Sequence, residues 1–397
     1  MKVAFFSNYL NHHQLPFCLA MQKLTNNNFT FVATTRIPET RLQLGYDDMN
    51  NKYNFVLQTY VSKENEEKAM KLALESDVII TAAGCSPEKY TTERIKQNKL
   101  TFRYSERIFK EDLKFYKWPR YFASMTLKHS IYTNKPLYML CCSNFTAHDF
   151  NRFGAYKGKC YKWGYFPQTT SLTADELFEI KNKNDKPTLL WVGRLIDWKH
   201  CEMAIKLAEE IKSKKMDFRL DIIGTGELET ELKEMISDRE LEEYVFMLGS
   251  KKTDEVRRYM EKADIFLFTS DFNEGWGAVL NESMSSACAV VASHAAGSVG
   301  FLIDNNKSGI IYYNENQKDM NNKVIDLLNN HDNIQSLGRA AYDAIANEWN
   351  ANVAARRILE LSEYLMSNKK GTPFPSGICS LSENISNKEA GERILKK

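Results

Sequence analysis

The chain has 397 residues, 43% of them hydrophobic, which is enough for two cores of ordinary size. Its 53 Lys and Arg against 51 Asp and Glu leave a net charge of +2, and so small a surplus does not favour a nucleic-acid partner. The eight cysteines form no C-x-x-C pair, which argues against a zinc ribbon or a thioredoxin-like site and favours reduced, structural thiols.

No apolar run reaches the roughly 18 residues that a membrane-spanning helix needs. The apolar run at the N-terminus ends at Ser7, which is too early for a signal peptide. We therefore expect a cytoplasmic protein whose first residues form a buried strand.

Short apolar runs alternate with segments of helical periodicity through most of the chain. In the first half, strands are predicted at residues 2–7, 29–35, 77–82, 100–105 and 137–142. Segments such as LPFCLAMQKL and EEKAMKLALES, which lie between them, are predicted helices. In the second half, strands are predicted at residues 187–193, 218–224, 244–249, 263–270 and 288–293. Continuous apolar strands separated by helices are typical of parallel sheets that are covered on both faces.

The two sets of strands predict two α/β domains of the doubly wound, Rossmann-like kind. The first is expected at residues 1–170 and the second at 187–345. Between them, residues 171–186 are rich in charge and poor in large apolar side chains, as is usual for a linker. Residues 368–397 begin with two prolines and two glycines and show little periodicity, so we expect a flexible tail or a weakly docked short helix.

The turn DFNEGWG joins the predicted strand ADIFLFTS to the predicted helix AVLNESMSSA. It places Glu274 at the carboxyl end of the strand and Glu282 about one turn into the helix. Gly275 and Gly277, on either side of Trp276, let the backbone approach a ligand beside the positive end of the helix. Two carboxylates there suit the recognition of hydroxyl groups, because a carboxylate only accepts hydrogen bonds. The alternative is a pair of solvated glutamates around a tight turn.

Three further patterns also follow strands of the second domain. GRLIDWK follows the strand PTLLWV and places Arg194 and Lys199 where a fork and a point charge could bind a polyanion. IIGTGELETEL contains Gly224 and Gly226, half of a dinucleotide fingerprint and a weak signal alone. SHAAGSVGFLIDNNKSGIIY has small residues after a strand, which suit another close backbone approach. Their shared position after strands of one domain is the stronger indication of a site.

Together these motifs resemble the donor-nucleotide domain of the retaining glycosyltransferases of family four, which have the GT-B fold. That family pairs two glutamates with seven residues between them, as Glu274 and Glu282 are paired here. Its Gly-Arg…Lys and Gly-x-Gly motifs are matched by Gly193, Arg194 and Lys199 and by Gly224 and Gly226. The resemblance implies two Rossmann-like domains that face a cleft. Residues 346–367 resemble the family's terminal helix, which crosses back onto the first domain.

The resemblance also implies a role for each matched residue. Arg194 and Lys199 would hold the diphosphate of the donor and stabilise the leaving nucleotide. Glu282 would bind the ribose hydroxyls, and Glu274 would contact the donor sugar together with the segment Gly275, Trp276 and Gly277. Cations of the protein would replace Mg²⁺, so no metal and no other cofactor is expected. No covalent nucleophile is assigned, because the front-face displacement of this family does not need one.

The first half departs from the family where its chemistry lies. The family often has a Gly-Gly at the first strand–helix turn, which here reads SNYLNHHQLP, and its later histidines are absent. Asn11, His12 and His13 are predicted donors on the acceptor or diphosphate side instead, although a helix N-cap and exposed surface would explain them as well. Glu106 and Arg107 follow a strand and are expected to face the cleft, where an ordinary ion pair fits equally. NHHQ and YSER resemble a subgroup that assembles polysaccharides.

The stretch from residue 101 to 170 contains 12 Lys and Arg against 4 Asp and Glu, with many aromatic residues between them. This combination fits an anionic membrane surface, at which a lipid-diphosphate-linked acceptor would be held. A solvated basic face over an aromatic core is the alternative.

The sequence thus predicts a cytoplasmic, metal-independent, retaining hexosyltransferase, peripheral at the inner membrane face. It would move a sugar from a nucleotide-sugar donor, most plausibly UDP-linked, to a glycan or lipid-linked acceptor in polysaccharide biosynthesis. Two other classes fit the same residues. One is a sugar-nucleotide epimerase or hydrolase on the same fold, and the other is a non-catalytic partner that binds sugar nucleotides.

Overall fold

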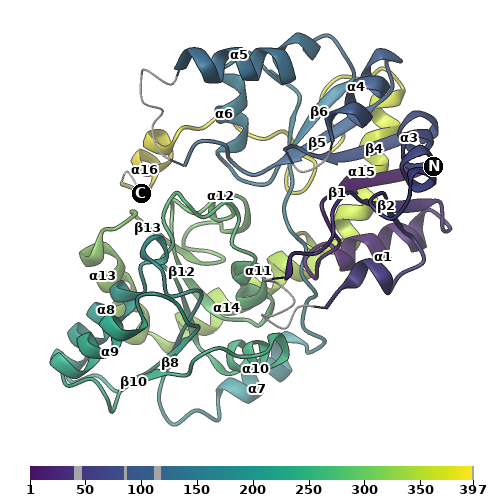
Figure 1. Cartoon of the computed structure of the whole chain (residues 1–397). Coiled ribbons are helices and arrows are strands. Elements are labelled where there is room, and N and C mark those ends of the chain that lie inside the picture. Colours follow the sequence, from purple (N-terminus) through teal and green to yellow (C-terminus); the bar gives the residue numbers. More distant parts are fainter. Residues whose placement is uncertain (40–46, 85–86, 111–117, 396–397) are drawn as a thin grey trace. The chain divides into compact units, whose positions relative to one another are not determined.

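The computed structural model describes residues 1–39, 47–84, 87–110 and 118–395. These residues form two compact units, which we call unit 1 and unit 2 (Figure 1). Unit 1 comprises residues 1–168 and 350–385, and unit 2 comprises residues 169–349 and 386–397. The seven cysteines that the structure describes are free and buried, as expected for structural thiols.

Unit 1 is built on a parallel sheet of seven strands in the order β3-β2-β1-β4-β5-β6-β7. The strands are β1 (Val3–Ser7), β2 (Phe29–Ala33), β3 (Val56–Gln58), β4 (Val78–Ala82), β5 (Thr101–Ser105), β6 (Leu137–Cys141) and β7 (Cys160–Lys162). The helices are α1 (Leu15–Leu24), α3 (Lys63–Glu75), α4 (Glu88–Lys96), α5 (Trp118–Lys128), α6 (Thr146–Asn151) and α15 (Ala351–Met366), with short 3₁₀ turns η1 (Met49–Asn51) and η3 (Ser130–Tyr132). The strand order reverses between β1 and β4.

Unit 2 is built on a parallel sheet of six strands in the order β10-β9-β8-β11-β12-β13. The strands are β8 (Thr188–Val192), β9 (Arg219–Ile223), β10 (Val245–Met247), β11 (Ile265–Phe268), β12 (Ala289–Ser293) and β13 (Ile310–Tyr312). The helices are α7 (Ala174–Lys181), α8 (Cys201–Ser213), α9 (Glu229–Asp238), α10 (Thr253–Lys262), α11 (Ala278–Ser285), α12 (Val299–Leu302), α13 (Gln317–Leu328), α14 (His331–Asn347) and α16 (Asn387–Leu395), with the 3₁₀ turn η4 (Asp197–Lys199). The order reverses between β8 and β11, which pair directly.

The predicted class of two doubly wound α/β domains is confirmed. The apolar runs became central strands because both faces of each sheet are covered, and β1, β4 and β12 are buried along their whole length. In such sheets ligands bind beyond the carboxyl ends of the strands, where the strand order reverses. In unit 2 this rule points to the loops that follow β8 and β11.

The expected linker at residues 171–186 is instead part of unit 2. Helix α7 begins in a capping box between Thr173 and Glu176, which satisfies the free backbone donors of its first turn. Its Leu177 and Phe178 are buried against Ala287. Of the charged residues in this helix, Asp175, Glu176 and Glu179 are exposed, whereas Lys181 is buried and donates to the backbone oxygen of Met260.

The end of the chain is also more ordered than predicted. Helix α15 lies in unit 1 and packs on α1, in agreement with the expected terminal helix that crosses back. The segment after it forms backbone hydrogen bonds with the edge strand β7, from Lys162 N to Ser380 O (2.8 Å) and from Cys379 N to Lys162 O (2.9 Å). Ile378 and Cys379 are fully buried. The prediction of a flexible tail is therefore wrong for the segment around Cys379, because this segment covers the open edge of the sheet at β7.

Candidate functional site

Lys199 and Glu274 meet at the carboxyl ends of the two strands that flank the reversal point of unit 2. The ammonium of Lys199, at the end of η4, donates to the Oε2 atom of Glu274, and only 13% and 11% of the two side chains are exposed. Ser270 Oγ donates to the same oxygen at 3.1 Å. The two residues predicted from separate motifs thus form one ion pair that is largely shielded from water.

The ring of Trp198 contacts two cations, Lys199 of the ion pair and Arg194. The guanidinium of Arg194 lies 5.7 Å from the centroid of the Trp198 ring, and the Lys199 ammonium lies 4.6 Å from it. Arg194 is exposed, whereas Lys199 is mostly covered. An anion that reached this loop would find one cation at the surface and one beneath it, both oriented by an aromatic face.

Glycine is required at positions 224 and 226 because of packing inside the protein. A β-carbon on Gly224 would lie 1.7 Å from the carbonyl oxygen of Gly193, and one on Gly226 would lie 2.2 Å from that of Leu195. Leu195 N donates to Thr225 O at 3.0 Å, so the loops after β8 and β9 pack backbone against backbone. The glycines therefore fix the loop that carries Arg194, and their contact with a ligand stays a prediction.

The segment from Gly275 to Gly277 turns the chain from β11 into α11. Gly277 has φ +83°, and a β-carbon there would lie 2.3 Å from Phe268 Cζ, so this turn requires glycine. The side chain of Trp276 is 1% exposed, and its Nε1 donates to Asn281 Oδ1 at 2.8 Å. The side chain of Trp276 thus anchors the turn from inside, and the contact of the backbone of residues 275–277 with a donor stays a prediction.

Glu282 also has a cationic partner. Its Oε1 atom lies 3.9 Å from Arg257, and the two side chains are 14% and 18% exposed. Burial raises the pKa of Glu282, and the charge of Arg257 opposes that shift. The alternative of two solvated glutamates is therefore wrong, since both carboxylates are largely buried and each faces a cation.

His200 was missed by the sequence analysis. It follows Lys199 in the left-handed conformation (φ 50°, ψ 47°), which costs a residue with a β-carbon about 1–2 kcal/mol. Its Nδ1 lies 3.2 Å from Glu202 Oε1 and its Nε2 lies 3.5 Å from Asp271 Oδ2. The pKa of His200 is raised to about 10, chiefly by Asp271 and then by Glu202. No sequence pattern links these three residues.

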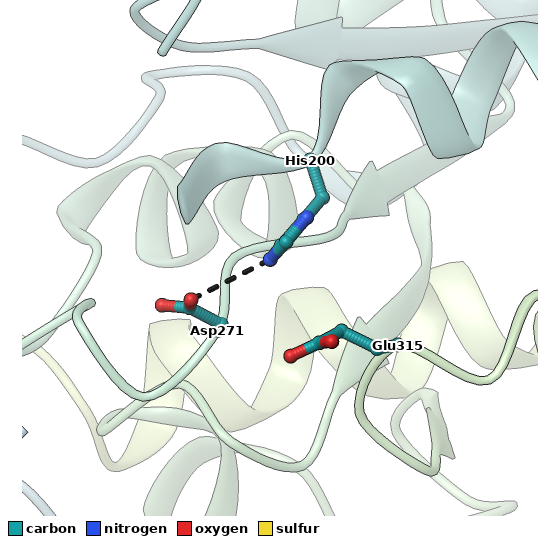
Figure 2. A group of neighbouring side chains, drawn as sticks. All are labelled: His200, Asp271 and Glu315. Carbon is teal, nitrogen blue, oxygen red and sulfur yellow. Dashed lines mark ion pairs between the residues drawn. The ribbon is translucent and has the colours of Figure 1, made fainter. Parts of the chain in front are cut away.

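Figure 2 shows His200 and Asp271 pointing toward each other, with the carboxylate of Glu315 beside them. The ligand atoms of these three side chains lie within 4.8 Å of one another, so they are a group in the described residues that could hold a metal ion. A metal would need the lone pair of Nε2. The neighbouring carboxylates of Asp271 and Glu202 raise the pKa of this histidine to about 10, so a metal ion would have to compete with a proton for that position.

In unit 1, the residues predicted after β1 are held by neutral hydrogen bonds. Asn11 Oδ1 accepts from the backbone of His13 and Gln14 at 3.0 and 3.1 Å, so this side chain organises the start of α1. His12 and His13 have ring centroids 3.7 Å apart. His13 and Gln14 line a pocket together with Tyr104, whose hydroxyl is 2.7 Å from Ser7 Oγ.

Glu106 and Arg107, the two residues predicted after β5, lie in different environments. Glu106 is partly exposed and accepts from the hydroxyl of Tyr165 at 2.7 Å. Arg107 is 6% exposed, donates from Nε to Phe109 O at 2.8 Å and lies over the ring of Phe145. The prediction that Arg107 is open to a ligand is therefore wrong, because its side chain is part of the core.

The comparisons with known proteins concern mainly unit 2. Residues 173–344 match the family model described as glycosyl transferases group 1. The chain is 31% identical over 182 residues to the amylovoran biosynthesis glycosyltransferase of Erwinia amylovora, which covers 45% of this chain and 44% of the relative. It is 28% identical over 170 residues to the poly(ribitol-phosphate) alpha-N-acetylglucosaminyltransferase of Staphylococcus aureus, covering 43% and 34%. The matched stretches span less than half of the length of these curated relatives.

The fold is similar to solved structures along most of the chain. An Anabaena protein crystallised in complex with UDP has a TM-score of 0.68 at 13% identity, with 92% of this chain and 100% of that chain covered. A sucrose-phosphate synthase from Thermosynechococcus elongatus has a TM-score of 0.62 at 15% identity, covering 92% and 99%. At these identities the similarity concerns the fold, and the predicted GT-B class is confirmed.

Proposed function

We propose that the chain transfers a sugar from a nucleotide-sugar donor to a glycan or lipid-linked acceptor, because residues 173–344 in unit 2 match the family model described as glycosyl transferases group 1. The observation that carries the proposal is the Lys199–Glu274 pair at the reversal point of the unit 2 sheet. Ligands of open parallel sheets bind beyond the carboxyl ends of the strands at the reversal point, and in unit 2 this position holds a charged pair.

In the proposed reaction, Arg194 and Lys199 bind the diphosphate of the donor. Departure of a nucleoside diphosphate develops negative charge on the leaving oxygen, and preorganised cations in a partly shielded site stabilise that charge. Lys199 would then share its ammonium between Glu274 and the phosphate. Glu274 in turn would accept from hydroxyls of the sugar, so that leaving group and sugar are held by the two members of one ion pair.

Glu282 is the proposed partner of the ribose. Its ionised carboxylate, 3.9 Å from Arg257, can accept from two neighbouring hydroxyls, and the charge of Arg257 favours that ionised form against the effect of burial. Replacement of either residue would then weaken the binding of the nucleotide itself, without a direct effect on the sugar.

The finer features of the reaction are proposed from the relatives. UDP as the nucleotide is supported by the Anabaena structures with UDP and with UDP-glucose. A glycan product is supported by relatives named for amylovoran and colanic acid biosynthesis, and a lipid-linked acceptor by a Campylobacter relative named for a diphospho-undecaprenol substrate. Retention of the anomeric configuration and independence from metal follow from the family resemblance.

The proposed acceptor side includes a membrane surface that α5 contacts. Three large apolar or aromatic side chains of this helix, Tyr121, Phe122 and Leu127, are 38%, 53% and 67% exposed. Its charged residues are the exposed Arg120 and Lys128, with no acidic residue between them. Apolar and basic side chains together suit an anionic lipid surface.

Fewer residues of the basic stretch from 101 to 170 can contact a membrane than the sequence suggested. Arg103 and Arg107 are buried, so they cannot contribute to it, and Phe115 and Tyr116 lie outside the described residues. In the part of the chain that the structure describes, no helix is long and apolar enough to cross a membrane. Contact through α5 would therefore be peripheral.

Co-sedimentation with anionic and neutral vesicles across a salt series tests this contact. Phe122→Ser with Leu127→Ser should reduce binding to anionic vesicles, whereas Leu19→Ser, which alters another exposed apolar residue of unit 1, should not. Higher salt should also reduce it, because charges are screened beyond about 10 Å at 0.1 M. Equal binding to both kinds of vesicle, or none at low salt, would refute the contact.

A thermal-shift screen against nucleotide sugars, followed by assays with and without acceptor, tests the transferase itself. A donor that binds only the folded protein raises the melting temperature by mass action. We expect a UDP-sugar to do so and to be slowly hydrolysed without acceptor. A new sugar nucleotide formed from the donor alone would indicate an epimerase, and binding with no turnover would indicate a non-catalytic partner.

A further inference from the structure

The histidine after Lys199 occupies a backbone position that glycine or asparagine would fit better. His200 ends η4 and precedes α8 with φ 50° and ψ 47°. Residues with a β-carbon are held in this region only where their surroundings over-determine it, and such positions gather at functional sites. The side chain of His200 therefore needs a role that offsets the conformational cost.

The contacts of that side chain lead into a second loop. His200 is 15% exposed, and it lies between Glu202 at the start of α8 and Asp271 after β11. The ring thus lies between a carboxylate of helix α8 and a carboxylate of the loop after β11. Figure 2 shows the second of these contacts, between His200 and Asp271.

Asp271 is the junction through which this contact reaches the site. Its backbone N–H donates to Trp198 O at 3.1 Å, and its carbonyl accepts from Glu274 N at 3.1 Å. Glu274 is in turn paired with Lys199, the neighbour of His200. The four residues form a closed ring. Lys199 and His200 are neighbours in the chain, Asp271 and Glu274 are joined by a backbone hydrogen bond, and the two loops are linked by the side-chain contacts of His200 with Asp271 and of Lys199 with Glu274.

We propose that His200 is a positioning residue whose ring ties the loop after β8 to the loop after β11 and so keeps Lys199 and Glu274 in register for the donor. The inference rests on the proposed function, since it concerns how the donor site is held. His200 need not touch the donor. Its positive charge, set between Glu202 and Asp271 with Glu315 close by, holds the two loops at a fixed separation.

Substitution of His200 by Gly separates this role from folding. His200→Gly relieves the left-handed backbone and removes the link, so the melting temperature should fall by no more than about 4 °C. The affinity for UDP should fall about five- to thirtyfold, the effect of losing one or two good contacts. His200→Asn, which tolerates the backbone but carries no charge, should behave like His200→Gly, whereas His200→Lys should restore part of the affinity.

A matched control lies at the other end of the same helix. Lys215 also has a left-handed backbone (φ 57°) and is exposed, so Lys215→Gly makes the same backbone change without the link. It should leave UDP affinity unchanged. Asp271→Asn should reproduce the defect of His200→Gly, and the double variant should be no worse than either single one, because both remove the same contact.

Hydrogen exchange gives a readout that does not depend on ligand. His200→Gly should raise exchange in residues 269–277 as well as around residue 200, although the substitution lies in only one of the two loops. UDP affinity within twofold of the wild type, together with unchanged exchange in 269–277, would overturn the proposal. Loss of wild-type affinity on addition of EDTA would also overturn it, in favour of a metal ion bound by His200, Asp271 and Glu315.

The two proposals fail in different ways. If the wild type binds no nucleotide or nucleotide sugar, the proposed function is wrong, and the exchange measurement alone then decides whether His200 links the loops. If the wild type binds UDP and His200→Gly binds it equally well with unchanged exchange, the function stands and only the positioning role is lost.

Discussion

The turns at the reversal points of the two sheets are held by different chemistry. In unit 2, the loops after β8 and β11 are joined by ions, through Lys199 with Glu274 and His200 with Asp271. In unit 1, the turn after β1 is held by neutral groups, in which Gln14 Nε2 donates to Tyr104 and Ser7 at 3.1 and 3.3 Å.

The contrast shows how one scaffold can serve two kinds of ligand. Ion pairs that are shielded from water place fixed charge beside a binding site, which suits a charged diphosphate. Neutral amide and hydroxyl groups bind without a large desolvation cost and suit the hydroxyls of a sugar acceptor.

The largest effect is expected at Glu274, where the ion pair and the sugar would meet. Glu274→Ala should lower the rate of transfer about 10²–10³-fold, the usual loss when one preorganised polar group is removed from an active site. UDP binding should stay nearly intact. Glu282→Ala should do the reverse and weaken UDP itself. Steady-state transfer rates and calorimetry separate the two variants, and a normal rate in Glu274→Ala would make this carboxylate purely structural.

A large effect on stability is expected at Gly224. An added β-carbon would lie 1.7 Å from the oxygen of Gly193, so backbone atoms must move, and we expect a loss of about 3 kcal/mol or more. Gly84 in unit 1 also has a positive φ (79°), but no atom of the residues that the structure describes lies within 4 Å of the added carbon. Gly84→Ala should therefore cost only about 1–2 kcal/mol for the backbone. Similar losses in denaturant unfolding would contradict the tight packing of the unit 2 loops.

The charge of His200 should make unit 2 sensitive to alkali. Its pKa is raised from 6.5 to about 10 in the folded state, so its contribution is fully present below pH 6.5 and is lost as the pH rises through 10. Because solvent screens part of this interaction, we expect about 1–2 kcal/mol. The difference in unfolding free energy between wild type and His200→Gly should shrink over this range. A constant difference would show that His200 is not charged.

A small effect is expected in unit 1. Tyr104→Phe removes the hydroxyl that joins Ser7 and Gln14 and should cost about 1 kcal/mol of stability, the net value of a neutral hydrogen bond. UDP affinity should not change. If this variant weakened UDP as strongly as a substitution in the unit 2 loops, the division of charged and neutral roles between the units would be wrong.

The sequence was sufficient for most of the fold. Long apolar runs and helical periodicity located every central strand, because burial on both faces leaves a continuous apolar pattern. The edge strands β3, β7 and β13 were missed, whereas the edge strand β10, which also has three residues, was predicted because it lies in the longer apolar run YVFMLG. The ordered end of the chain was missed for a similar reason: its prolines and glycines concealed a short apolar segment, ICSL, that pairs with β7.

The sequence was less informative about the site. Spacing placed Glu274, Lys199 and Glu282 correctly at strand and helix ends, since topology decides those positions. It could not tell which way a side chain points, and the side chains of Trp276 and of Arg107, which was expected to face the cleft, lie in the core. It also missed His200, whose partner Asp271 is remote in sequence and meets it only through the pairing of β8 with β11.

The central claim is that the loops after β8 and β11 bind the donor diphosphate through Lys199 and Arg194. Calorimetric titration of UDP into wild type, Lys199→Ala and Arg194→Ala tests it most directly. Lys233→Ala is the control, because Lys233 is also paired with a carboxylate in unit 2, at 2.7 Å from Glu229, but is 60% exposed on a helix surface. We predict that Lys199→Ala weakens binding by about 1.5–3 kcal/mol, the value of a charged hydrogen bond, while Lys233→Ala has no effect. Unchanged affinity in both Lys199→Ala and Arg194→Ala would contradict the claim.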